Sequence, residues 1–336
     1  MTVLVTGGGG FVGFNVVEHL LAHGREVVLF DRGPVPPAAR RTVAPHAKLL
    51  TVVQADIGDL PELIRLCEHH SIEGIIHCAA MTAGAEREAR DPISVVNANL
   101  IGTINVLDAA RRTKVRRVVY ANSSSVYGEM LYKGLPRLFE DTTIPIPVRL
   151  YSITKQAAER TCIRMRELWN LDVVSARLGN VIGPWERDTG VRDRFEPHSQ
   201  LVSFAASGQE AILPSSEIPR DLVYVRDVAA GLSVLLDAQS TRHCVYNLSA
   251  GQVWGNTMVA WCETLKSISP GFRFHRAREG EDPNITYSDG ERSLMDMGRM
   301  FNEFGFRSRE QAAVWADFAE WIRRTPDFWN NPRSGS

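Results

Sequence analysis

The stretch VLVTGGGGFVG, residues 3–13, decides the fold, because an apolar run passes through a glycine-rich turn directly into a helical pattern. Gly7 lets the chain turn sharply, Gly10 lets the backbone approach a pyrophosphate, and Gly13 lets the helix pack closely on the strand. Asp31 ends the next apolar run, at the distance expected for a carboxylate that accepts hydrogen bonds from an adenosine ribose. The pattern predicts a dinucleotide-binding unit.

Asp31 also predicts which dinucleotide is bound. A carboxylate repels the additional phosphate of NADP, whereas the neighbouring Arg32 would attract it. Because Asp31, and not Arg32, occupies the position that binds the ribose hydroxyls, we expect the cofactor to be NAD. Phe11 and Val12, which open the helix after the glycines, are expected to contact the same cofactor.

The first half of the chain alternates short apolar runs with amphipathic stretches. Fully apolar strands separated by helices are what a parallel sheet covered on both faces requires. This predicts an α/β fold of the Rossmann type, with a doubly wound parallel sheet. The expected strands are Val3–Thr6, Glu26–Asp31, Leu49–Ala55, Gly74–Cys78 and Val115–Asn122, and the expected helices are Phe11–His23, Leu60–His70 and Pro92–Arg112.

A further helix over Tyr151–Trp169 and a strand over Val173–Leu178 extend this alternation. Beyond Asn180, prolines and glycines break the chain into short elements. We therefore predict a NAD-binding domain over residues 1–180 and a smaller substrate-binding cap mainly over residues 181–330.

The two regions are expected to be interleaved. The strand Leu222–Val225 and the helix Arg226–Asp237 are apolar enough to return to the main sheet. Residues 221–250 are therefore predicted to contribute to the NAD-binding domain.

The composition argues against nucleic acid, membranes and metals as partners. Lysine and arginine number 38 against 39 acidic residues, so the formal net charge of −1 gives no general attraction to nucleic acid or an anionic membrane. No basic leader precedes the first strand, and no apolar run approaches the ~18 residues that span a bilayer. The five cysteines are widely spaced without a CxxC pair, which argues against disulfides or a zinc site and predicts the cytoplasm.

Two motifs carry the candidate chemistry. YSITK, residues 151–155, begins a predicted helix, so that Tyr151 and Lys155 project from one face. A phenol with a pKa of ~10 is a poor base at neutral pH, but a neighbouring ammonium and the positive nicotinamide ring favour the phenolate. Upstream, an apolar strand runs into three serines, residues 123–125, at the carboxyl end of the sheet. We expect Ser123 to hold the reacting hydroxyl while Tyr151 removes its proton.

Taken together, the motifs resemble those of the extended short-chain dehydrogenase/reductases, the NAD-dependent epimerase/dehydratase family. The resemblance covers almost the whole chain and implies a NAD-dependent enzyme with Ser123, Tyr151 and Lys155 as catalytic residues. The matching segments are TGGGGFVG (6–13), FDRG (30–33), ADI (55–57), HCAA (77–80), NANLIGT (97–103), SSSVYG (123–128), YSITK (151–155), RLGNVIGP (177–184), RDLVYVRDVA (220–229) and YNLSAG (246–251).

The resemblance also implies cofactor contacts and a partner. Asp56 and Ile57 are expected to hold the adenine, Ala79 and Ala80 to pass behind the cofactor, and Asn99 to support the sheet at the cofactor site. Members of the family commonly dimerise through helices that correspond to residues 92–112 and 151–169, so a homodimer is expected.

The implied substrate contacts come from four residues. Asn180 and Arg220 match positions that commonly touch a nucleotide-sugar diphosphate, and Arg278 matches another such position less closely. Ser124, beside the catalytic serine, is also expected to contact the substrate.

Several departures from the family pattern narrow the activity. Ser125 replaces the acidic residue that sugar dehydratases and decarboxylases tend to carry before the VYG segment, which disfavours elimination. The segment EPHSQL, residues 196–201, lacks the Asn-Leu or Asn-Phe pair that often meets the nucleotide. Arg149 and the charged stretch Trp185–Arg194 are also atypical. We expect solvated loop charges there, with a pocket for a carboxylate or phosphate as the alternative.

These observations predict a NAD-dependent epimerase of a nucleotide-activated sugar, which oxidises a secondary hydroxyl transiently and returns the hydride. The alternative is a NAD-dependent dehydrogenase of a sugar, sugar acid or other secondary alcohol. A non-catalytic dinucleotide sensor is a third hypothesis, and the presence of Ser123, Tyr151 and Lys155 argues against it.

Overall fold

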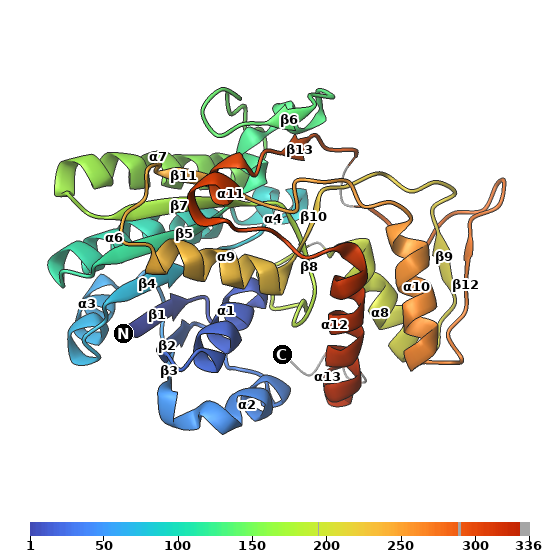
Figure 1. The fold of residues 1–336 in the computed structure, drawn as a ribbon, viewed down its shortest axis with the longest axis horizontal. Coiled ribbons are helices and arrows are strands. Elements are labelled where there is room, and N and C mark those ends of the chain that lie inside the picture. The colour runs from blue at the N-terminus through green and yellow to red at the C-terminus, as the bar shows by residue number, and fades with distance from the viewer. Residues whose placement is uncertain (194, 288–289, 330–336) are drawn as a thin grey trace.

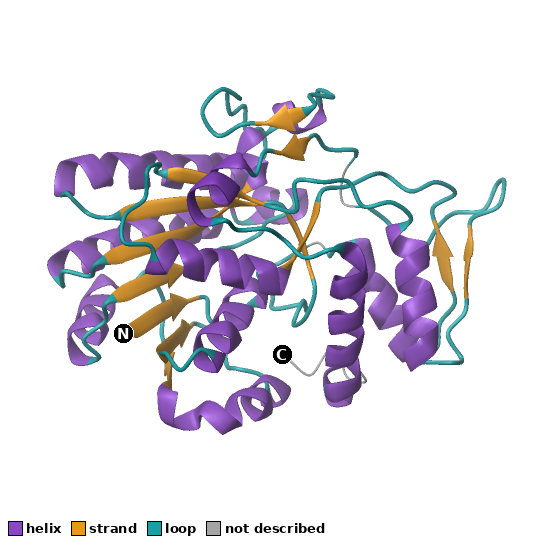
Figure 2. Cartoon of the chain, viewed as in Figure 1, coloured by secondary structure: helices purple, strands orange, loops and turns teal. Residues whose placement is uncertain are grey.

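A seven-stranded parallel sheet forms the centre of the computed structural model, which describes residues 1–193, 195–287 and 290–329 (Figures 1 and 2). The strand order is β11-β7-β5-β4-β1-β2-β3. This confirms the predicted Rossmann-type fold. The strands are β1 (Thr2–Thr6), β2 (Glu26–Asp31), β3 (Leu50–Gln54), β4 (Gly74–His77), β5 (Arg117–Ser123), β7 (Val173–Leu178) and β11 (Val245–Leu248).

Helices cover both faces of the sheet, which is why its central strands are apolar throughout. On one face, α1 (Phe11–Ala22) packs against α9 (Val225–Asp237), and both share a core with the sheet. On the other face, α3 (Leu60–His69), α6 (Gly102–Arg112) and α7 (Leu150–Trp169) share a second core. The other helices of this half are α2 (Pro37–Val43), α4 (Ala85–Arg90) and α5 (Pro92–Val96).

The predicted helix Pro92–Arg112 is continuous, but it contains a π-helical turn at Asn97–Ile101 between α5 and α6. π-helical turns are frequent at functional sites. By length and composition this segment could also cross a membrane, and 44% of its most apolar stretch is buried within the protein. The core helices of soluble proteins share this length and composition, so a single such segment is weak evidence for a membrane span.

Most of the chain after β7 forms the cap, a region of short elements at the right of Figure 1. Aromatic side chains make much of its core, and the rings of Trp261 and Phe318 stack 4.6 Å apart. The cap contains β8 (Asn180–Ile182), α8 (Pro197–Ser207), β9 (Ala211–Leu213), β10 (Leu222–Tyr224), α10 (Thr257–Ile268), β12 (Phe274–Arg276), α12 (Gln311–Arg324) and α13 (Pro326–Trp329). Of the remaining elements, β6 (Arg137–Leu138) pairs with β13 (Leu294–Met295), and α11 (Gly298–Phe304) packs against β11.

One prediction about the interleaving is wrong. The strand β10 does not return to the main sheet but pairs in parallel with β8 in a separate two-stranded sheet. The edge of β7 that it would need is already paired with β11. The following helix α9 does pack against β4 and β5, as expected.

Candidate active site

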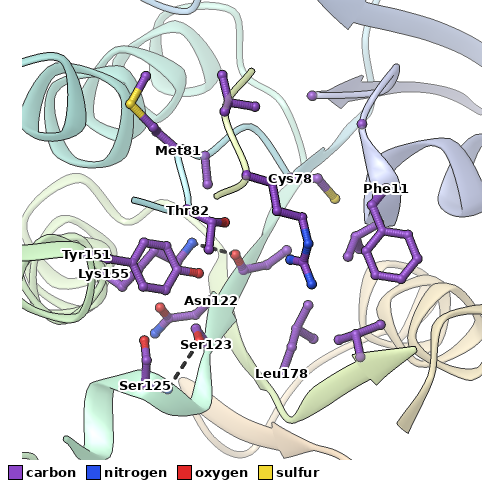
Figure 3. Close-up of a pocket in the computed structure, with 18 of the residues that line it drawn as sticks. Phe11, Cys78, Met81, Thr82, Asn122, Ser123, Ser125, Tyr151, Lys155 and Leu178 are labelled. Carbon is purple, nitrogen blue, oxygen red and sulfur yellow. Dashed lines mark hydrogen bonds between the residues drawn. The ribbon is translucent and has the colours of Figure 1, made fainter. Parts of the chain in front are cut away.

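A cavity of about 630 Å³ opens at the carboxyl ends of the parallel strands, where ligands bind in this architecture. Its wall joins the glycine turn after β1, the ends of several strands, the start of α7 and a loop of the cap (Figure 3). Asn99, Arg220 and Arg278 are outside this wall. The predicted site residues within it are Gly7, Gly10, Phe11, Val12, Asp31, Arg32, Asp56, Ile57, Ala79, Ala80, Ser123, Ser124, Arg149, Tyr151, Lys155 and Asn180.

The glycine turn leaves space for a ligand at Gly10 and is closed elsewhere. Gly7 has a φ of +65°, and a Cβ there would lie 2.6 Å from the Ala79 nitrogen. A Cβ on Gly13 would lie 2.0 Å from the Gly7 oxygen, whereas one on Gly10 would meet only that oxygen, at 3.2 Å. No side chain caps the N-terminus of α1 and its first turn contains no acidic residue, so its N–H groups fit a pyrophosphate.

Asp31 is fixed at the end of β2 by two backbone donors. The Gly9 N–H donates to Oδ2 and the Gly33 N–H donates to Oδ1, both at 2.9 Å. The carboxylate therefore lies against the glycine turn, in the position expected for binding ribose hydroxyls. Together with the uncapped start of α1, it gives the chemistry that NAD requires.

Asn99 lies behind the cavity wall. Its Oδ1 accepts a hydrogen bond from the Met81 N–H at 2.7 Å, and its Nδ2 donates to the Met81 carbonyl at 3.0 Å. Nδ2 also donates to Thr154 Oγ1 at 3.1 Å, which links this segment to α7. Asn99 thus supports the chain just after Ala79 and Ala80 and does not itself line the cavity.

Ser123 and Tyr151 meet where β5 ends and α7 begins (Figure 3). Burial raises the pKa of Tyr151. Four groups oppose this rise: the Ser123 hydrogen bond, the Arg192 charge, the Thr82 hydrogen bond and the Arg292 charge. Thr82 and Arg292 were not predicted from the sequence, whereas Arg192 belongs to the charged stretch for which a pocket was the alternative expectation. These four groups favour the phenolate, but burial has the larger effect, so the pKa of Tyr151 lies above its ordinary value.

Lys155 lies on the same face of α7, one turn after the tyrosine. Its Nζ donates to the Ala121 carbonyl at 2.7 Å and lies 4.2 Å from the centre of the Tyr120 ring. Burial lowers the pKa of Lys155 to about 7, and electrostatic interactions with Cys78, Cys162 and Glu159 act in the opposite direction. Lys155 can therefore change its protonation near neutral pH.

A buried ion pair fixes α7 against the sheet. Arg177 on β7 donates to the two carboxylate oxygens of Glu159 at 2.6 and 2.9 Å, and their side chains are 4% and 1% exposed. Asn122 Nδ2 donates to the same carboxylate at 2.6 Å. Because Glu159 follows Lys155 by one helical turn and Asn122 precedes Ser123, this pair sets the spacing of the catalytic residues.

The residues expected to bind a diphosphate are not gathered at one place. Asn180, at the start of β8, lines the cavity and accepts a hydrogen bond from Arg292 Nη1 at 2.6 Å. Arg220 is buried outside the wall, 4.0 Å from the Glu196 carboxylate and 4.6 Å from the centre of the Tyr287 ring.

Arg278 does not reach the cavity, contrary to the prediction. It is exposed in the loop after β12. That strand pairs with β9 at the outer edge of the cap (Figure 1), which keeps the loop away from the sheet. Arg292, which the sequence patterns did not single out, lies in the wall instead.

The charged stretch after β8 is not a solvated loop, and this expectation is corrected. Trp185 is fully buried, and Arg187 and Arg192 line the cavity. Arg192 pairs with the buried carboxylate of Glu186 and lies 5.3 Å from the centre of the Phe11 ring. These charges fold back over the cavity because Trp185 docks on α1. Arg194, which belongs to the same predicted stretch, lies outside the described residues.

Comparison with known proteins agrees with this geometry. The NAD dependent epimerase/dehydratase family matches residues 3–249. The match confirms the family resemblance, the enzyme class and NAD as the cofactor.

Three similar proteins illustrate the match. The UDP-glucuronate 4-epimerase of Thermodesulfobacterium geofontis (strain OPF15) is 27% identical over 85% of this chain and 87% of its own. UDP-glucuronate 4-epimerase 4 of Arabidopsis thaliana is 30% identical over 70% of this chain, but the match spans only 54% of that protein. The solved structure of MoeE5 in complex with UDP-glucose and NAD is 26% identical, with a TM-score of 0.74 over 97% of this chain and 100% of that chain.

Proposed function

We propose that this chain, which belongs to the NAD dependent epimerase/dehydratase family, is an epimerase of a nucleotide-linked sugar. The observation that carries the proposal is the convergence of Ser123, Tyr151 and Lys155 beside a glycine turn that fits a dinucleotide, all within one cavity. The similarity to two UDP-glucuronate 4-epimerases supports it.

The chain's own groups account for the proton transfers. Tyr151 removes the proton of a secondary hydroxyl while Ser123 holds the oxygen, and the nearby cations stabilise the phenolate. NAD, which the glycine turn and Asp31 would hold, would supply the acceptor for the hydride of the carbon that bears this hydroxyl and the donor for its return to the opposite face. Tyr151 then gives the proton back to the oxygen, so no net oxidation remains.

Ser125 supports epimerisation over dehydration. Its hydroxyl lies in the cavity wall and is buried without a hydrogen-bond partner among the residues that the structure describes. A hydroxyl there can bind a substrate oxygen, but it lacks the carboxyl group that assists elimination.

The positive wall of the cavity supports an acidic sugar as the substrate. Arg149, Arg192 and Arg292 all line it. Arg192 and Arg292 are partly buried there and Arg149 is exposed, and a carboxylate or phosphate of the substrate would pair with these cations. UDP-glucuronate is therefore the first substrate to test.

The test is incubation of the purified protein with UDP-glucuronate or UDP-glucose without added NAD. We expect chromatography to resolve a growing second epimer, with no net increase in absorbance at the NADH wavelength. The Tyr151→Phe protein is the matched control. A fold-competent protein that forms no epimer from any nucleotide-linked sugar contradicts the proposal.

One observation favours a second candidate, a NAD-dependent dehydrogenase of a free sugar acid. Arg220 is enclosed by Glu196 and Tyr287, and Arg278 is exposed, so a diphosphate site is not preformed. Formation of one NADH for each sugar acid oxidised, with NAD added and without binding of UDP, would establish this alternative.

We further propose that the protein is a cytoplasmic homodimer. Ile93 on α5, Ile101 in the π-turn and Ile153 on α7 are 69%, 43% and 44% exposed. Exposed apolar side chains on neighbouring helices support an interface there. Light scattering is expected to give a dimer for wild type and a monomer for Ile153→Asp, with Val253→Asp, elsewhere on the surface, as the control. The free thiol state of the cysteines supports the cytoplasm, which cell fractionation tests.

A further inference from the structure

We propose that the segment Trp185–Asp193, called the strap below, keeps NAD on the protein throughout turnover, and that Arg187 is the strap residue that pairs with the cofactor's pyrophosphate. The inference deepens the proposed function and rests on it, because only a transient oxidation requires the reduced cofactor to stay beside the substrate.

The first residues of the strap are anchored to α1. Asn15 Nδ2 donates to the Pro184 carbonyl at 2.9 Å, and Trp185 Nε1 donates to the Glu18 carboxylate at 2.8 Å. The indole is fully buried and packs edge-on against Phe14, with ring centres 5.0 Å apart. Trp185 also has a φ of +69°, which a bulky residue adopts only where the surroundings enforce it. The chain is thereby directed back over the start of α1.

The last residues of the strap are anchored to the segment after β4. The Thr82 N–H donates to the Val191 carbonyl at 2.8 Å, and the Asp193 N–H donates to the Thr82 carbonyl at 3.2 Å. The Asp193 carboxylate also accepts hydrogen bonds from Arg87, from Nη2 at 2.6 Å and from Nε at 2.9 and 3.1 Å. Figure 3 shows Thr82 and Phe11, the first residue of α1, on opposite sides of the cavity. The strap therefore crosses the cavity and is anchored on each side of it.

Between these anchors, Arg187 reaches the phosphate-binding turn. Its Nη2 donates to the Gly9 carbonyl at 2.7 Å, and its Nη1 is buried without a hydrogen-bond partner within residues 1–193, 195–287 and 290–329. Burial lowers the pKa of Arg187, and the Asp31 charge opposes this only in part. The positive charge of the guanidinium is thus only partly compensated. It lies next to a helix N-terminus that also attracts anions. A pyrophosphate at this point satisfies both groups.

The arrangement predicts slow release of the cofactor. NAD leaves its site only after the Arg187 contact breaks and the strap lifts, and lifting requires the Asp193–Arg87 pair to separate. Removing either contact therefore accelerates dissociation, and neither substitution replaces Ser123, Tyr151 or Lys155.

The experiment measures dissociation of NADH in the absence of substrate. The protein is loaded with NADH, excess NAD is added in a stopped-flow instrument, and the loss of protein-bound NADH fluorescence gives the rate constant. We expect Arg187→Gln and Asp193→Asn each to release NADH about tenfold faster or more than wild type, the effect of losing one charge-assisted hydrogen bond. Arg324→Gln and Glu320→Gln, which remove an exposed ion pair of α12, are the matched controls and keep the wild-type rate.

Each outcome has a defined meaning. Rates within about twofold of wild type for both strap variants would overturn the proposal. Acceleration by Asp193→Asn alone would overturn the role of Arg187, and acceleration by Arg187→Gln alone would overturn the role of the strap anchor. Because Asp193 is partly exposed, its variant keeps the test usable if Arg187→Gln does not fold. Epimer formation by wild type is measured separately. Fast NADH release by wild type with normal epimer formation would contradict the strap proposal alone. Slow NADH release by wild type without epimer formation would contradict the proposed function alone.

Discussion

Replacing Lys155 by methionine is expected to stabilise the cofactor-free protein at neutral pH while removing its activity. Burial lowers the pKa of Lys155 from its ordinary value of 10.5 to about 7. Below about pH 7 the ammonium is charged in both the folded and the unfolded chain, so folding carries the full cost of burying a cation. Each pH unit between the two pKa values corresponds to about 1.36 kcal/mol, which gives a cost of about 4 kcal/mol at pH 7.

The sign of the pH dependence follows from proton binding. Between the folded pKa of about 7 and the unfolded value of 10.5, the unfolded chain binds the proton that the folded chain lacks, so the free energy of unfolding rises with pH. At about pH 9.5 the remaining cost is about 1 kcal/mol. Methionine cannot bind a proton, so the stability advantage of Lys155→Met over wild type shrinks by about 3 kcal/mol between about pH 7 and pH 9.5.

Urea unfolding of both proteins without cofactor, at several pH values across this range, measures the difference. Lys48→Met, at an exposed position, is the matched control and is expected to follow wild type at every pH. The reasoning is refuted if the difference between Lys155→Met and wild type stays constant within about 0.5 kcal/mol.

Four other outcomes are expected. Tyr151→Phe keeps the fold and NAD binding but lowers turnover at least about 100-fold, and near-normal turnover in a folded variant would remove the mechanism. Isothermal titration is expected to show tighter binding of NAD than of NADP, because Asp31 meets the additional phosphate; equal affinities would contradict this role of Asp31. Arg192→Gln removes a charge that lowers the pKa of Tyr151, so the alkaline rise of kcat/KM with pH shifts to higher pH, and an unchanged midpoint would argue against that contact. Arg177→Met leaves Glu159 buried without its cation and is expected to lower the free energy of unfolding, measured in urea, by about 3 to 5 kcal/mol. Adding Glu159→Met is expected to restore part of this loss, and an unchanged free energy of unfolding in Arg177→Met would contradict the role of the pair.

The central strands could be predicted from the sequence because burial on both faces produces uninterrupted apolar runs. The predicted strand over residues 173–178 agrees with β7 at both ends. The pairing of the short apolar runs later in the chain could not be predicted from the sequence. The strands β10 and β11 are similar in length and apolar character, and only long-range packing decides which one pairs with β7. Local pattern therefore predicts a strand more reliably than its neighbour in a sheet.

The candidate site divides in the same way. The meeting of Ser123 and Tyr151 was predictable because each lies at a defined point of a strand or helix. Thr82, Arg192 and Arg292 come from three separate segments without periodic pattern, so nothing in the sequence indicates that they converge on one phenol. In the sequence, the charges of the strap also resemble those of a solvated polar loop. Only the burial of Trp185 against α1, which the structure shows, directs this segment back over the cavity.

The position of Arg192 on the strap links retention of the cofactor to the catalytic chemistry. Arg192 is among the charges that lower the pKa of Tyr151, and it lies on the same short segment as Arg187, which contacts the phosphate-binding turn. Lifting the strap to release the cofactor therefore also withdraws a cation from the base. A dehydrogenase would have to dismantle and rebuild this environment at every turnover, because its reduced cofactor must leave. In the proposed epimerase both hydride transfers would take place with the strap closed, so Tyr151 would keep Arg192 beside it in the oxidising and the reducing half-reactions alike.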